Sequence, residues 1–526
     1  MQDYDVLILG AGPTGATLAN ALRNDGHKVA IFDRDKEAFH APRAMGLDDE
    51  SLRILNQCGL YHDLSDGFLP ISDMRFTNKK RKRLMSMRPS EIDGQMGYPF
   101  ANLFHQVKFD THLRNCLRDG VDTFFGWEVA RVEDTGESAV LVAKNTDTDE
   151  VKEFRGQFVV GCDGGASITR RTMKAGRIDL GYSEDFFVMD ALVADEAYFD
   201  SIPDGGEQTC DPERPLLIFK GVDGHMRFDR KRANNEPLEA FETYAKELIG
   251  KYFDADQFEI IRIAPYTFYA STSDSWRKGR LLIVGDAAHQ TPPWAGQGLN
   301  SGLRDVINLR FKLDFVLKGK ASGALLDTYQ EERLVPAQDT IRGAMISGKM
   351  FTLKNPLLVA LRNSFFFLAR TFEAIPRYFL SRVLIQRPPY PRGSGLTGMH
   401  PLAGHLSIQP EVETPSGESG LMDDVIGSGF VLLSKNPVDS DLTDKLAAAV
   451  GARSLVINQG VIDRHGKLTA WLDAHDANCV LLRPDKYVYS AGKSAEALCE
   501  EFLDQWSKYA PVRPDAKRST GSVLFG

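Results

Sequence analysis

Short apolar runs alternate with helical stretches at the start of the chain. Residues 6–9 and 29–32 are apolar runs of strand length, separated by a glycine turn at 10–15 and an alanine-rich helix. This order predicts a βαβ unit with a parallel pair of strands. Similar runs at 158–161 and 281–284 are each followed by an acidic residue and small residues. We therefore expect a Rossmann-like sheet that is assembled from distant parts of the chain.

The pattern changes between about residues 181 and 274. Segments there, such as 186–189 and 215–219, are β-rich but do not alternate with helices, which favours a second, mainly antiparallel domain. A helical tract rich in Phe and Leu, with interspersed arginines, follows from about residue 302 to 382. We expect it to pack on the second domain or to form a dimer seam, and a helix on a membrane surface is the alternative.

A proline-rich run at 387–395 breaks the helical pattern and marks a linker. From about Met399, short strands alternate with helical stretches, which predicts a separate small α/β domain. Its two cysteines, Cys479 and Cys499, are too far apart in the sequence for a redox pair. We expect this domain to have a structural or oligomeric role.

The composition excludes several classes of protein. With 526 residues, 43% of them hydrophobic, the chain is too large for one core and should form two or three domains. Lys and Arg number 63 against 72 Asp and Glu, a formal charge of −9, which argues against nucleic acid as a partner. No run of roughly 18 apolar residues occurs, so no membrane span is expected. The N-terminus lacks the features of an export signal, which favours the cytoplasm.

The cysteines are scattered along the chain. No Cys-x-x-Cys pair occurs, and no spacing suits a zinc site or a disulfide framework. We expect a reducing compartment and no bound metal.

The first motif with chemical meaning is Gly10-x-Gly12-x-x-Gly15, which follows a strand and opens a helix. Gly10 permits a tight turn, Gly12 lets the backbone approach a pyrophosphate, and Gly15 lets helix and strand pack closely. The helix N-terminus then faces the negative charge. Asp33, at the end of the second strand, is placed to accept hydrogen bonds from a ribose. These features indicate an adenine dinucleotide without saying which one.

The second motif, residues 285–300, lies between a buried strand and a helix. Asp286 comes at the end of the strand, where a carboxylate can hold a sugar-alcohol hydroxyl. A Gly-x-Gly turn then opens the helix and directs N–H groups at an electron-rich ring edge. Flavins carry a ribityl chain and nicotinamide cofactors do not, so the motif favours a flavin. His289 is expected to support this loop rather than to act in catalysis.

The third motif is Asp163-Gly164 at the end of another strand, with Arg170 and Arg171 just beyond it. An Asp-Gly turn after a strand is common, so the pair on its own leaves a purely structural role open. No second strand–Gly-x-Gly-x-x-Gly–helix unit occurs in the sequence. That absence argues against two-domain disulfide reductases and against Baeyer–Villiger monooxygenases with two such domains.

Together these motifs resemble those of the flavoprotein aromatic hydroxylases, the single-component FAD monooxygenases. The resemblance covers residues 1 to about 340. Within this family, the runs at 42–50 and 292–302 look like the 3-(3-hydroxyphenyl)propionate hydroxylases, and hydroxylases of polyketide rings share much of them. The resemblance implies FAD as cofactor and NADH or NADPH as co-substrate. It also implies hydroxylation of a phenolic ring by O₂, ortho to an existing hydroxyl, through a flavin hydroperoxide and within aromatic catabolism.

Two alternative functions stay open. One is a hydroxylase of polycyclic aromatic polyketides in secondary metabolism. The other is a flavin-binding protein without oxygenase activity, such as an electron carrier or a sensor, because fold alone does not fix function.

The resemblance also assigns residues to the cofactor. Asp286 is expected on the ribityl chain, residues 298–300 at the isoalloxazine ring, and the Asp163-Gly164 pair at both FAD and NAD(P)H. Asp33 stands where the family more often has Glu. The residues expected to contact FAD are Gly10, Gly12, Pro13, Thr14, Gly15, Asp33, Arg34, Arg43, Gln106, Asp163, Gly164, Asp286, Pro293, Gly296, Gly298, Leu299 and Asn300.

The reaction needs a dry pocket and a group that removes or polarises the phenol proton. Pro293 is expected near the reactive carbon of the flavin. Strand alternation places Tyr266 and Tyr269 on opposite faces, and either tyrosine also suits a core position. Arg227 is expected to pair with a substrate carboxylate. The candidates for the base are His225, Arg227, Tyr266 and Tyr269.

The expected fold class is α/β, with three domains and a helical segment. By the same resemblance, these are a Rossmann-like FAD-binding domain at 1–180 and 275–340, an interleaved β-rich substrate domain at 181–274, a helical segment at 341–390 and a thioredoxin-like C-terminal domain at 399–526. The expected partners are a small phenolic molecule and O₂, and a homodimer is left open.

Overall fold

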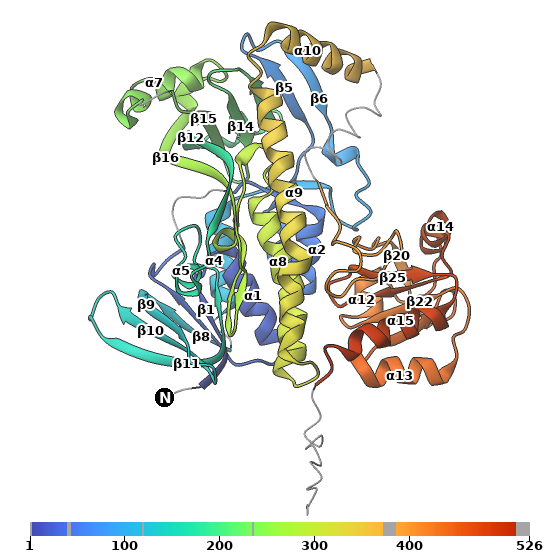
Figure 1. Ribbon diagram of the computed structural model, residues 1–526. Coiled ribbons are helices and arrows are strands. Elements are labelled where there is room, and N and C mark those ends of the chain that lie inside the picture. Colours follow the sequence, from blue (N-terminus) through green and yellow to red (C-terminus); the bar gives the residue numbers. More distant parts are fainter. Residues whose placement is uncertain (1–2, 39–43, 118–119, 234–235, 372–385, 512–526) are drawn as a thin grey trace, which may run out of the picture.

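The computed structural model describes residues 3–38, 44–117, 120–233, 236–371 and 386–511. Two large sheets, a pair of long central helices and a separate C-terminal domain make up this part of the chain (Figure 1). Arg43, expected at the cofactor, lies outside the described residues.

The first sheet is parallel at its centre, in the strand order β18-β11-β1-β2-β8. Val6, Leu7 and Ile8 of β1 are all fully buried, so both faces of this strand are covered, as continuous apolar runs in parallel sheets require. The expectation of a Rossmann-like sheet drawn from distant parts of the chain is confirmed. The central strands are β1 (Asp3–Leu9), β2 (Val29–Asp33), β8 (Val121–Phe125), β11 (Val151–Gly161) and β18 (Leu281–Ile283).

Three further strands and two helices complete this domain. β10 pairs antiparallel with β11 and β9, and β17 pairs antiparallel with β18. α1 connects β1 to β2, as the βαβ pattern predicts, and α5 follows β11. The bounds are β9 (Trp127–Asp134), β10 (Ala139–Asn145), β17 (Arg277–Lys278), α1 (Pro13–Asn24) and α5 (Ile168–Met173).

The second sheet has the order β19-β16-β12-β15-β14-β13-β5-β6 and is antiparallel except for the β13–β5 pair. It extends beyond residues 181–274, because β5 and β6 come from an earlier part of the chain and join the sheet through β13. α7 (Leu238–Gly250) covers one face, over an apolar cluster that includes Phe187 and Phe228. The strands are β5 (Met74–Asn78), β6 (Arg83–Met87), β12 (Arg177–Val193), β13 (Gly205–Cys210), β14 (Leu216–Lys220), β15 (His225–Lys231), β16 (Phe258–Ser273) and β19 (His289–Gln290).

A small three-stranded sheet with the order β3-β7-β4 leads into two helices. Asp48 ends β3 and caps α2, since its Oδ1 accepts a hydrogen bond from the Ser51 backbone N–H at 2.9 Å. The elements are β3 (Gly46–Asp48), α2 (Asp49–Gln57), β4 (Phe68–Pro70), β7 (Ala101–Phe104) and α4 (Gln106–Cys116), with the short helices α3 (Tyr61–Leu64) and α6 (Glu196–Ser201) elsewhere.

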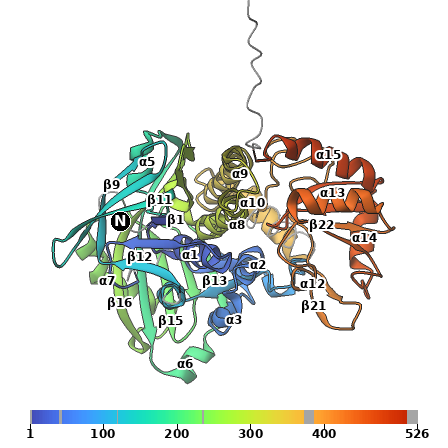
Figure 2. The same cartoon turned by 90° about the horizontal axis from the view of Figure 1, so that it is seen from below.

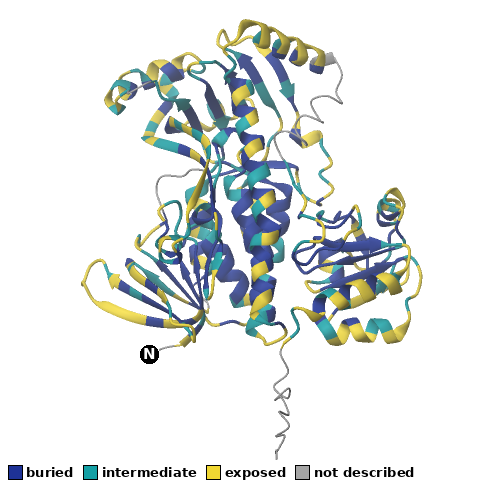
Figure 3. Cartoon of the chain, in the orientation of Figure 1, coloured by how far each residue is buried: buried dark blue, intermediate teal, exposed yellow. Residues whose placement is uncertain are grey.

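Long helices run along the centre of the molecule (Figure 1). α8 (Gly298–Leu317) is buried on most sides, and α9 (Thr328–Phe351) packs beside it. α10 (Pro356–Thr371) lies on the second sheet beside β6, as expected of the tract that contains it, while much of its outer face is exposed (Figure 3). Residues 372–382 of that tract lie outside the described part of the chain. Among the helices that the structure describes, none combines the length and the apolar character needed to cross a bilayer.

The C-terminal domain lies beside α8 and α9, away from the two large sheets (Figure 2). Its mixed sheet has the order β23-β22-β24-β25, with β22 parallel to β23 and antiparallel to β24. This arrangement, with helices packed on the sheet, is the expected thioredoxin-like fold. The elements are β20 (Glu411–Glu413), β21 (Ser419–Leu421), α12 (Met422–Ile426), β22 (Val431–Ser434), α13 (Ser440–Val450), β23 (Arg453–Val456), α14 (Lys467–Ala474), β24 (Cys479–Leu482), β25 (Val488–Gly492) and α15 (Ala495–Ser507).

The two cysteines of this domain are buried free thiols. Burial raises the pKa of Cys479 to about 11 and that of Cys499 to about 12, so neither forms the thiolate that redox exchange requires. This agrees with a structural rather than a redox role for the domain.

Buried ion pairs join the C-terminal domain to the central helices. Glu332 of α9 accepts hydrogen bonds at 2.7 Å from Lys312 of α8 and from Arg483 of the C-terminal domain. Arg483 also binds Asp485 at 2.7 Å, and all four side chains are fully buried. Burial would raise the pKa of Glu332, but Arg483 and Lys312 lower it to about 2. The carboxylate is therefore charged, and its partners come from both sides of the interface.

Replacing Arg483 tests this interface. Arg483→Met should destabilise the protein by about 3–5 kcal/mol, because Glu332 and Asp485 would share Lys312 as their remaining cation in the buried cluster. Thermal unfolding followed by circular dichroism should show a Tm several degrees lower. The control, Arg131→Met, breaks an exposed ion pair and should leave Tm almost unchanged. Equal Tm values for the two variants would contradict the expectation.

Candidate active site

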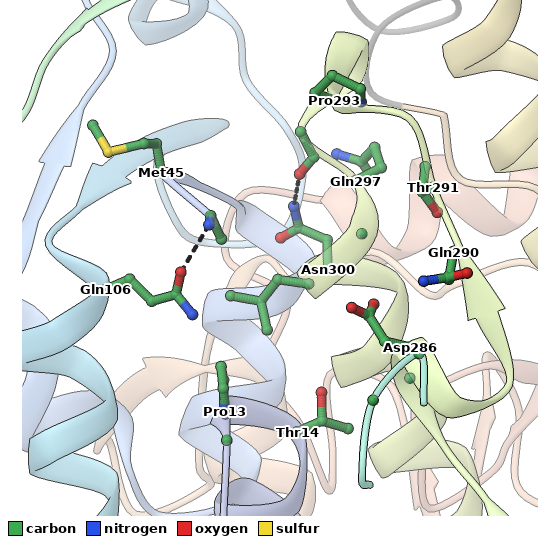
Figure 4. Close-up of a pocket in the computed structure, with 18 of the residues that line it drawn as sticks. Pro13, Thr14, Met45, Gln106, Asp286, Gln290, Thr291, Pro293, Gln297 and Asn300 are labelled. Atoms are coloured by element: carbon green, nitrogen blue, oxygen red, sulfur yellow. Dashed lines mark hydrogen bonds between the residues drawn. The ribbon is translucent and has the colours of Figure 1, made fainter. Parts of the chain in front are cut away.

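A cavity of about 770 Å³ is lined by residues of both large sheets. The glycine turn after β1 lies at one end, and side chains of the second sheet lie at the other. The loop before α8 forms a wall between them, with Asp286, Pro293 and Asn300 facing the cavity (Figure 4). The cavity therefore brings together motifs that are far apart in the sequence.

The turn at the start of α1 requires glycine at two positions. Gly10 has φ +92°, and a Cβ there would lie 2.4 Å from the carbonyl oxygen of Cys162. A Cβ at Gly15 would lie 2.0 Å from the carbonyl oxygen of Gly10, whereas one at Gly12 would meet open space. Gly12, Pro13 and Thr14 line the cavity, while Gly15 packs beneath the turn. α1 begins without a side-chain cap, so its first N–H groups are available to an anion.

Buried charges brace the loop between β18 and α8. His289 Nε2 lies 2.7 Å from Asp305 Oδ2, and the other oxygen of Asp305 accepts a hydrogen bond from Arg333 at 2.8 Å. The backbone N–H of Gly285 also donates to Asp305, at 3.1 Å. Burial would raise the pKa of Asp305, but His289 and Arg333 hold it below its usual value. His289 thus supports the loop, as expected.

The glycine turn and this loop meet at Thr14. A Cβ at Gly302 would lie 2.7 Å from Thr14 Oγ1, and one at Gly285 would lie 3.2 Å from it. The N-termini of α1 and α8 therefore come close together. The two predicted cofactor motifs form one continuous wall.

Asn300 uses its side-chain amide to fix this wall. Its Oδ1 accepts hydrogen bonds from the backbone N–H of Asp48 at 3.1 Å and from Ser51 Oγ at 2.6 Å. Its Nδ2 donates to the carbonyl oxygens of Gly296 at 2.8 Å and Gly46 at 3.3 Å (Figure 4 shows the bond to Gly296). Asn300 also lines the cavity, while its amide holds the chain in place.

Asp33 and Asp163, two carboxylates expected at the cofactor, also accept hydrogen bonds within the protein. Asp33 accepts hydrogen bonds from the backbone N–H groups of Ala11 at 2.7 Å and Asp35 at 2.9 Å, and from Arg114 at 2.9 Å. Asp163 Oδ2 accepts from Ile168 N–H at 2.8 Å, at the start of α5. Both residues line the cavity, as do Arg34, Gln106 and Gly164. Their carboxylates thus shape the backbone as well as facing a ligand.

Several polar atoms of the cavity wall fit a polar ligand. Asn102 Oδ1, Asp110 Oδ1, Asp163 Oδ1 and Thr291 Oγ1 are buried and have no hydrogen-bond partner among the described residues. An unsatisfied buried group costs about 1–3 kcal/mol, so a ligand with several hydrogen-bonding groups would be stabilised here. Burial raises the pKa of Asp110 to about 7, so this carboxyl can be protonated or ionised near neutral pH. Together with the turn and the helix N-terminus, these atoms fit an extended FAD molecule.

The end of the cavity at the second sheet is aromatic. Tyr266 and Phe268 of β16 both line it, and their rings form an edge-to-face pair 4.5 Å apart. Trp294, from the loop before α8, packs on Phe186 at 5.5 Å. Such a wall excludes water and accepts a planar ring. The other apolar side chains that line this end are Ile71, Met74, Phe76, Leu217, Phe219 and Phe351.

Asp229 of β15 is a charged residue within this aromatic end. Burial raises the pKa of its carboxyl, and Arg227 opposes that shift. Arg227 Nε donates to Asp229 Oδ1 at 2.7 Å. Asp229 is not among the residues expected from the sequence. The available signal was strand alternation, which places Asp229 on the same face as Arg227.

Two of the predicted catalytic residues lie outside the cavity wall. His225 faces Asp190, with Nε2 3.1 Å from Asp190 Oδ1, and Arg227 is fully buried beside Asp229. Neither residue lines the cavity, whereas Asp229 of the same strand does. Pro293, Tyr266 and Tyr269 do line the cavity.

Among the residues that the structure describes, one group of potential metal ligands occurs outside the cavity. Asp63, His112 and Cys116 bring ligand atoms within 4.8 Å of one another near α3 and α4. Asp63 is exposed, and groups of exposed acidic side chains are common in proteins without a metal ion. The three side chains are therefore not part of the candidate active site.

Known proteins match most of the chain. A family model described as an FAD binding domain matches residues 3–344, and one described as the HcaD C-terminal domain matches residues 404–505. The 3-(3-hydroxy-phenyl)propionate/3-hydroxycinnamic acid hydroxylase of Mycolicibacterium gilvum is 33% identical over 523 residues, covering 93% of this chain and 89% of that protein.

Solved structures share the fold. The flavin-dependent monooxygenase PieE, in complex with FAD and substrate, superposes with a TM-score of 0.78 at 20% identity, covering 96% of this chain and 99% of PieE. The anhydrotetracycline hydroxylase OxyS of Streptomyces rimosus gives 0.76 at 22% identity, covering 97% and 100% of the two chains. With a family model matched over most of its length and a relative 33% identical along 93% of it, the chain belongs to the FAD-dependent aromatic hydroxylases.

Proposed function

We propose that this enzyme hydroxylates a single-ring phenol ortho to its existing hydroxyl, using NADH or NADPH and O₂. The observation that carries the proposal is Asp229, a buried carboxylate set in an aromatic wall at the end of the cofactor cavity. The curated relative in Mycolicibacterium gilvum, a hydroxylase of 3-(3-hydroxy-phenyl)propionate and 3-hydroxycinnamic acid, supports a small phenolic substrate.

Bound FAD would supply the redox chemistry, taking a hydride from NAD(P)H and using it to activate O₂. The protein would hold FAD by the turn at 10–15 and by the loop at 285–300. Asn300 fixes the start of α8, and Pro293 lies beside it on the cavity wall. We propose that this segment would hold the isoalloxazine end of the flavin and that the second sheet would hold the phenol.

Asp229 would act on the phenol proton. An aromatic ring becomes electron-rich when its hydroxyl donates a strong hydrogen bond or loses its proton to a base. Asp229 lines the aromatic end of the cavity, and its raised pKa makes it a better proton acceptor than an exposed carboxylate. Tyr266 would assist by orienting the hydroxyl, since it lines the same end. We propose Asp229, rather than His225 or Arg227, as the base.

Two further proposals concern assembly and compartment. The exposed apolar side of α10, including Leu357, Leu361 and Phe367, gives a homodimer a surface on which to form, and light scattering of the purified chain would measure it. All six cysteines are free, which supports a reducing compartment such as the cytoplasm.

Small phenols should stimulate the oxidation of NAD(P)H by the purified enzyme. A panel of hydroxyphenyl acids and polycyclic phenols should separate single-ring substrates from larger ones, and mass spectrometry of the product should show one added oxygen ortho to the original hydroxyl. Stimulation by polycyclic phenols alone would favour the polyketide alternative. FAD binding without aromatic-stimulated O₂ consumption would favour an electron carrier or sensor.

Asp229→Asn should lower kcat/KM for the phenol by roughly 10²-fold or more, because a general base contributes about 10²–10⁴-fold. Asp229 must be ionised to accept the proton, so wild-type kcat/KM should fall as the pH drops through its raised pKa, and the variant should lose that decline. FAD content should stay the same in both. The control, Asp185→Asn, changes an exposed carboxylate on the same sheet. A pH profile that is unchanged in Asp229→Asn would contradict the assignment.

Asp286→Ala should weaken FAD binding by roughly tenfold, as expected for the loss of a hydrogen bond to a charged group. Visible absorbance after equilibrium dialysis against FAD measures the dissociation constant. Asp256→Ala, at an exposed position in a short 3₁₀ helix, is the control. Undiminished flavin retention in Asp286→Ala would count against its place on the ribityl chain.

A further inference from the structure

A row of buried polar side chains leads from the C-terminal domain to the cofactor wall. Tyr487 lies directly before β25, and its hydroxyl donates to Glu50 Oε1 of α2 at 2.6 Å. The other carboxylate oxygen of Glu50 accepts from Arg304 Nε of α8 at 2.7 Å. Arg304 then donates to Gln297 Oε1 at 3.0 Å and also binds Asp48. Three hydrogen bonds thus connect Tyr487 with the residue that precedes α8.

The far end of this row is part of the cavity itself. Gln297 and Asp48 both line the cavity. Gln297 directly precedes the segment 298–300 expected at the isoalloxazine ring, and the backbone N–H of Asp48 holds Asn300 Oδ1 at 3.1 Å. Arg304 therefore contacts both Gln297, which precedes α8, and Asp48, whose backbone N–H is one of the groups that hold Asn300.

The side chains of this row are buried, which restricts their movement. The side chains of Arg304, Glu50 and Asp48 are at most 3% exposed, and Tyr487 is 3% exposed. Burial would lower the pKa of Arg304, but Asp48 and Glu50 raise it, so the guanidinium stays charged. Its planar fork reaches Glu50, Asp48 and Gln297 with three different nitrogen atoms, a geometry that lysine cannot reproduce.

We propose that Tyr487 is a positioning residue for the cofactor site, acting through Glu50 and Arg304 on the flavin-facing segment 297–300. The C-terminal domain then supports the cofactor wall from outside the cavity, in addition to the structural role expected from the sequence. The inference rests on the binding of FAD and is independent of the identity of the aromatic substrate.

The chain contains a matched control for this hydroxyl. Tyr390, in the segment before the C-terminal domain, stacks on Tyr487 with ring centroids 4.0 Å apart and an angle of 10°. It is equally buried, yet its hydroxyl has no hydrogen-bond partner among the described residues. Tyr390→Phe thus removes a hydroxyl at the same depth without breaking the row.

The test compares Tyr487→Phe and Tyr390→Phe in the full-length chain loaded with FAD and without aromatic substrate. The readouts are the visible absorption spectrum of the bound flavin, its midpoint potential and the dissociation constant for FAD. Tyr487→Phe should shift the spectrum and the potential and weaken FAD binding roughly three- to tenfold, at or below the effect of losing a hydrogen bond made to FAD itself, because Glu50 and Arg304 would then hold segment 297–300 less firmly. Tyr390→Phe should match the wild type in all three.

Equal readouts for Tyr487→Phe and the wild type would overturn the proposal, even if Tm falls. Equal changes in both tyrosine variants would also overturn it, because the effect would then arise from packing. Should Tyr487→Phe fail to fold, Arg304→Lys takes its place, since it keeps the charge but loses the fork; a wild-type flavin spectrum in that variant would overturn the proposal. Because no aromatic substrate is present, failure of the proposed hydroxylation would leave these outcomes unaffected.

Discussion

The site depends on the close approach of Thr14, at the start of α1, to Gly285 after β18 and to Gly302 in the first turns of α8. A Cβ at Gly285 or Gly302 would lie 3.2 or 2.7 Å from Thr14 Oγ1. Because neither residue has a side chain, the N-termini of α1 and α8 can lie side by side, and both can face one ligand. A larger residue at either position would contact Thr14 and push the two helices apart, which would disrupt the cavity. The cofactor site therefore depends on glycines, which have no side chain, as much as on polar residues.

The buried charges have a different role. Burying an ion pair costs desolvation energy that an apolar contact of the same size would not incur, so stability alone does not explain Arg304, Glu332 and Arg483 at the interface with the C-terminal domain. These groups instead make the interface directional, because a buried guanidinium can place all of its donors on acceptors in only a few orientations. These directional contacts favour the docking orientation that the structure shows. That orientation places the hydroxyl of Tyr487 on Glu50, and through it sets the start of α8.

Local sequence patterns were sufficient for the parts of the site made by consecutive residues. The turn at 10–15 and the loop at 285–300 needed only glycine spacing, strand length and a following helix. Partners that are distant in the sequence were not predictable in this way. Asn300 was expected to meet the flavin, but its amide binds Asp48 and Ser51, about 250 positions earlier. His225 and Arg227 were named in β15 from their residue types, whereas Asp229, two positions beyond Arg227, is the residue of that strand that lines the cavity. Similarly, β5 and β6 belong to the second sheet only through pairing with β13, which no local pattern reveals.

The first sheet carries the cofactor motifs and the second sheet carries the aromatic end of the cavity, so the two sheets contribute differently to the choice of substrate. PieE and OxyS share the backbone arrangement over nearly the whole chain at about 20% identity, and a shared fold does not by itself set the substrate. Side chains on the cavity face of the second sheet must do so, and each aromatic ring there takes space from the ligand. Trp294 connects this selection to the cofactor, because it belongs to the loop before α8 yet packs on Phe186 and donates a hydrogen bond to Tyr182 at 2.7 Å. Trp294 thus joins the aromatic side chains of the second sheet and the loop before α8 in one set of contacts.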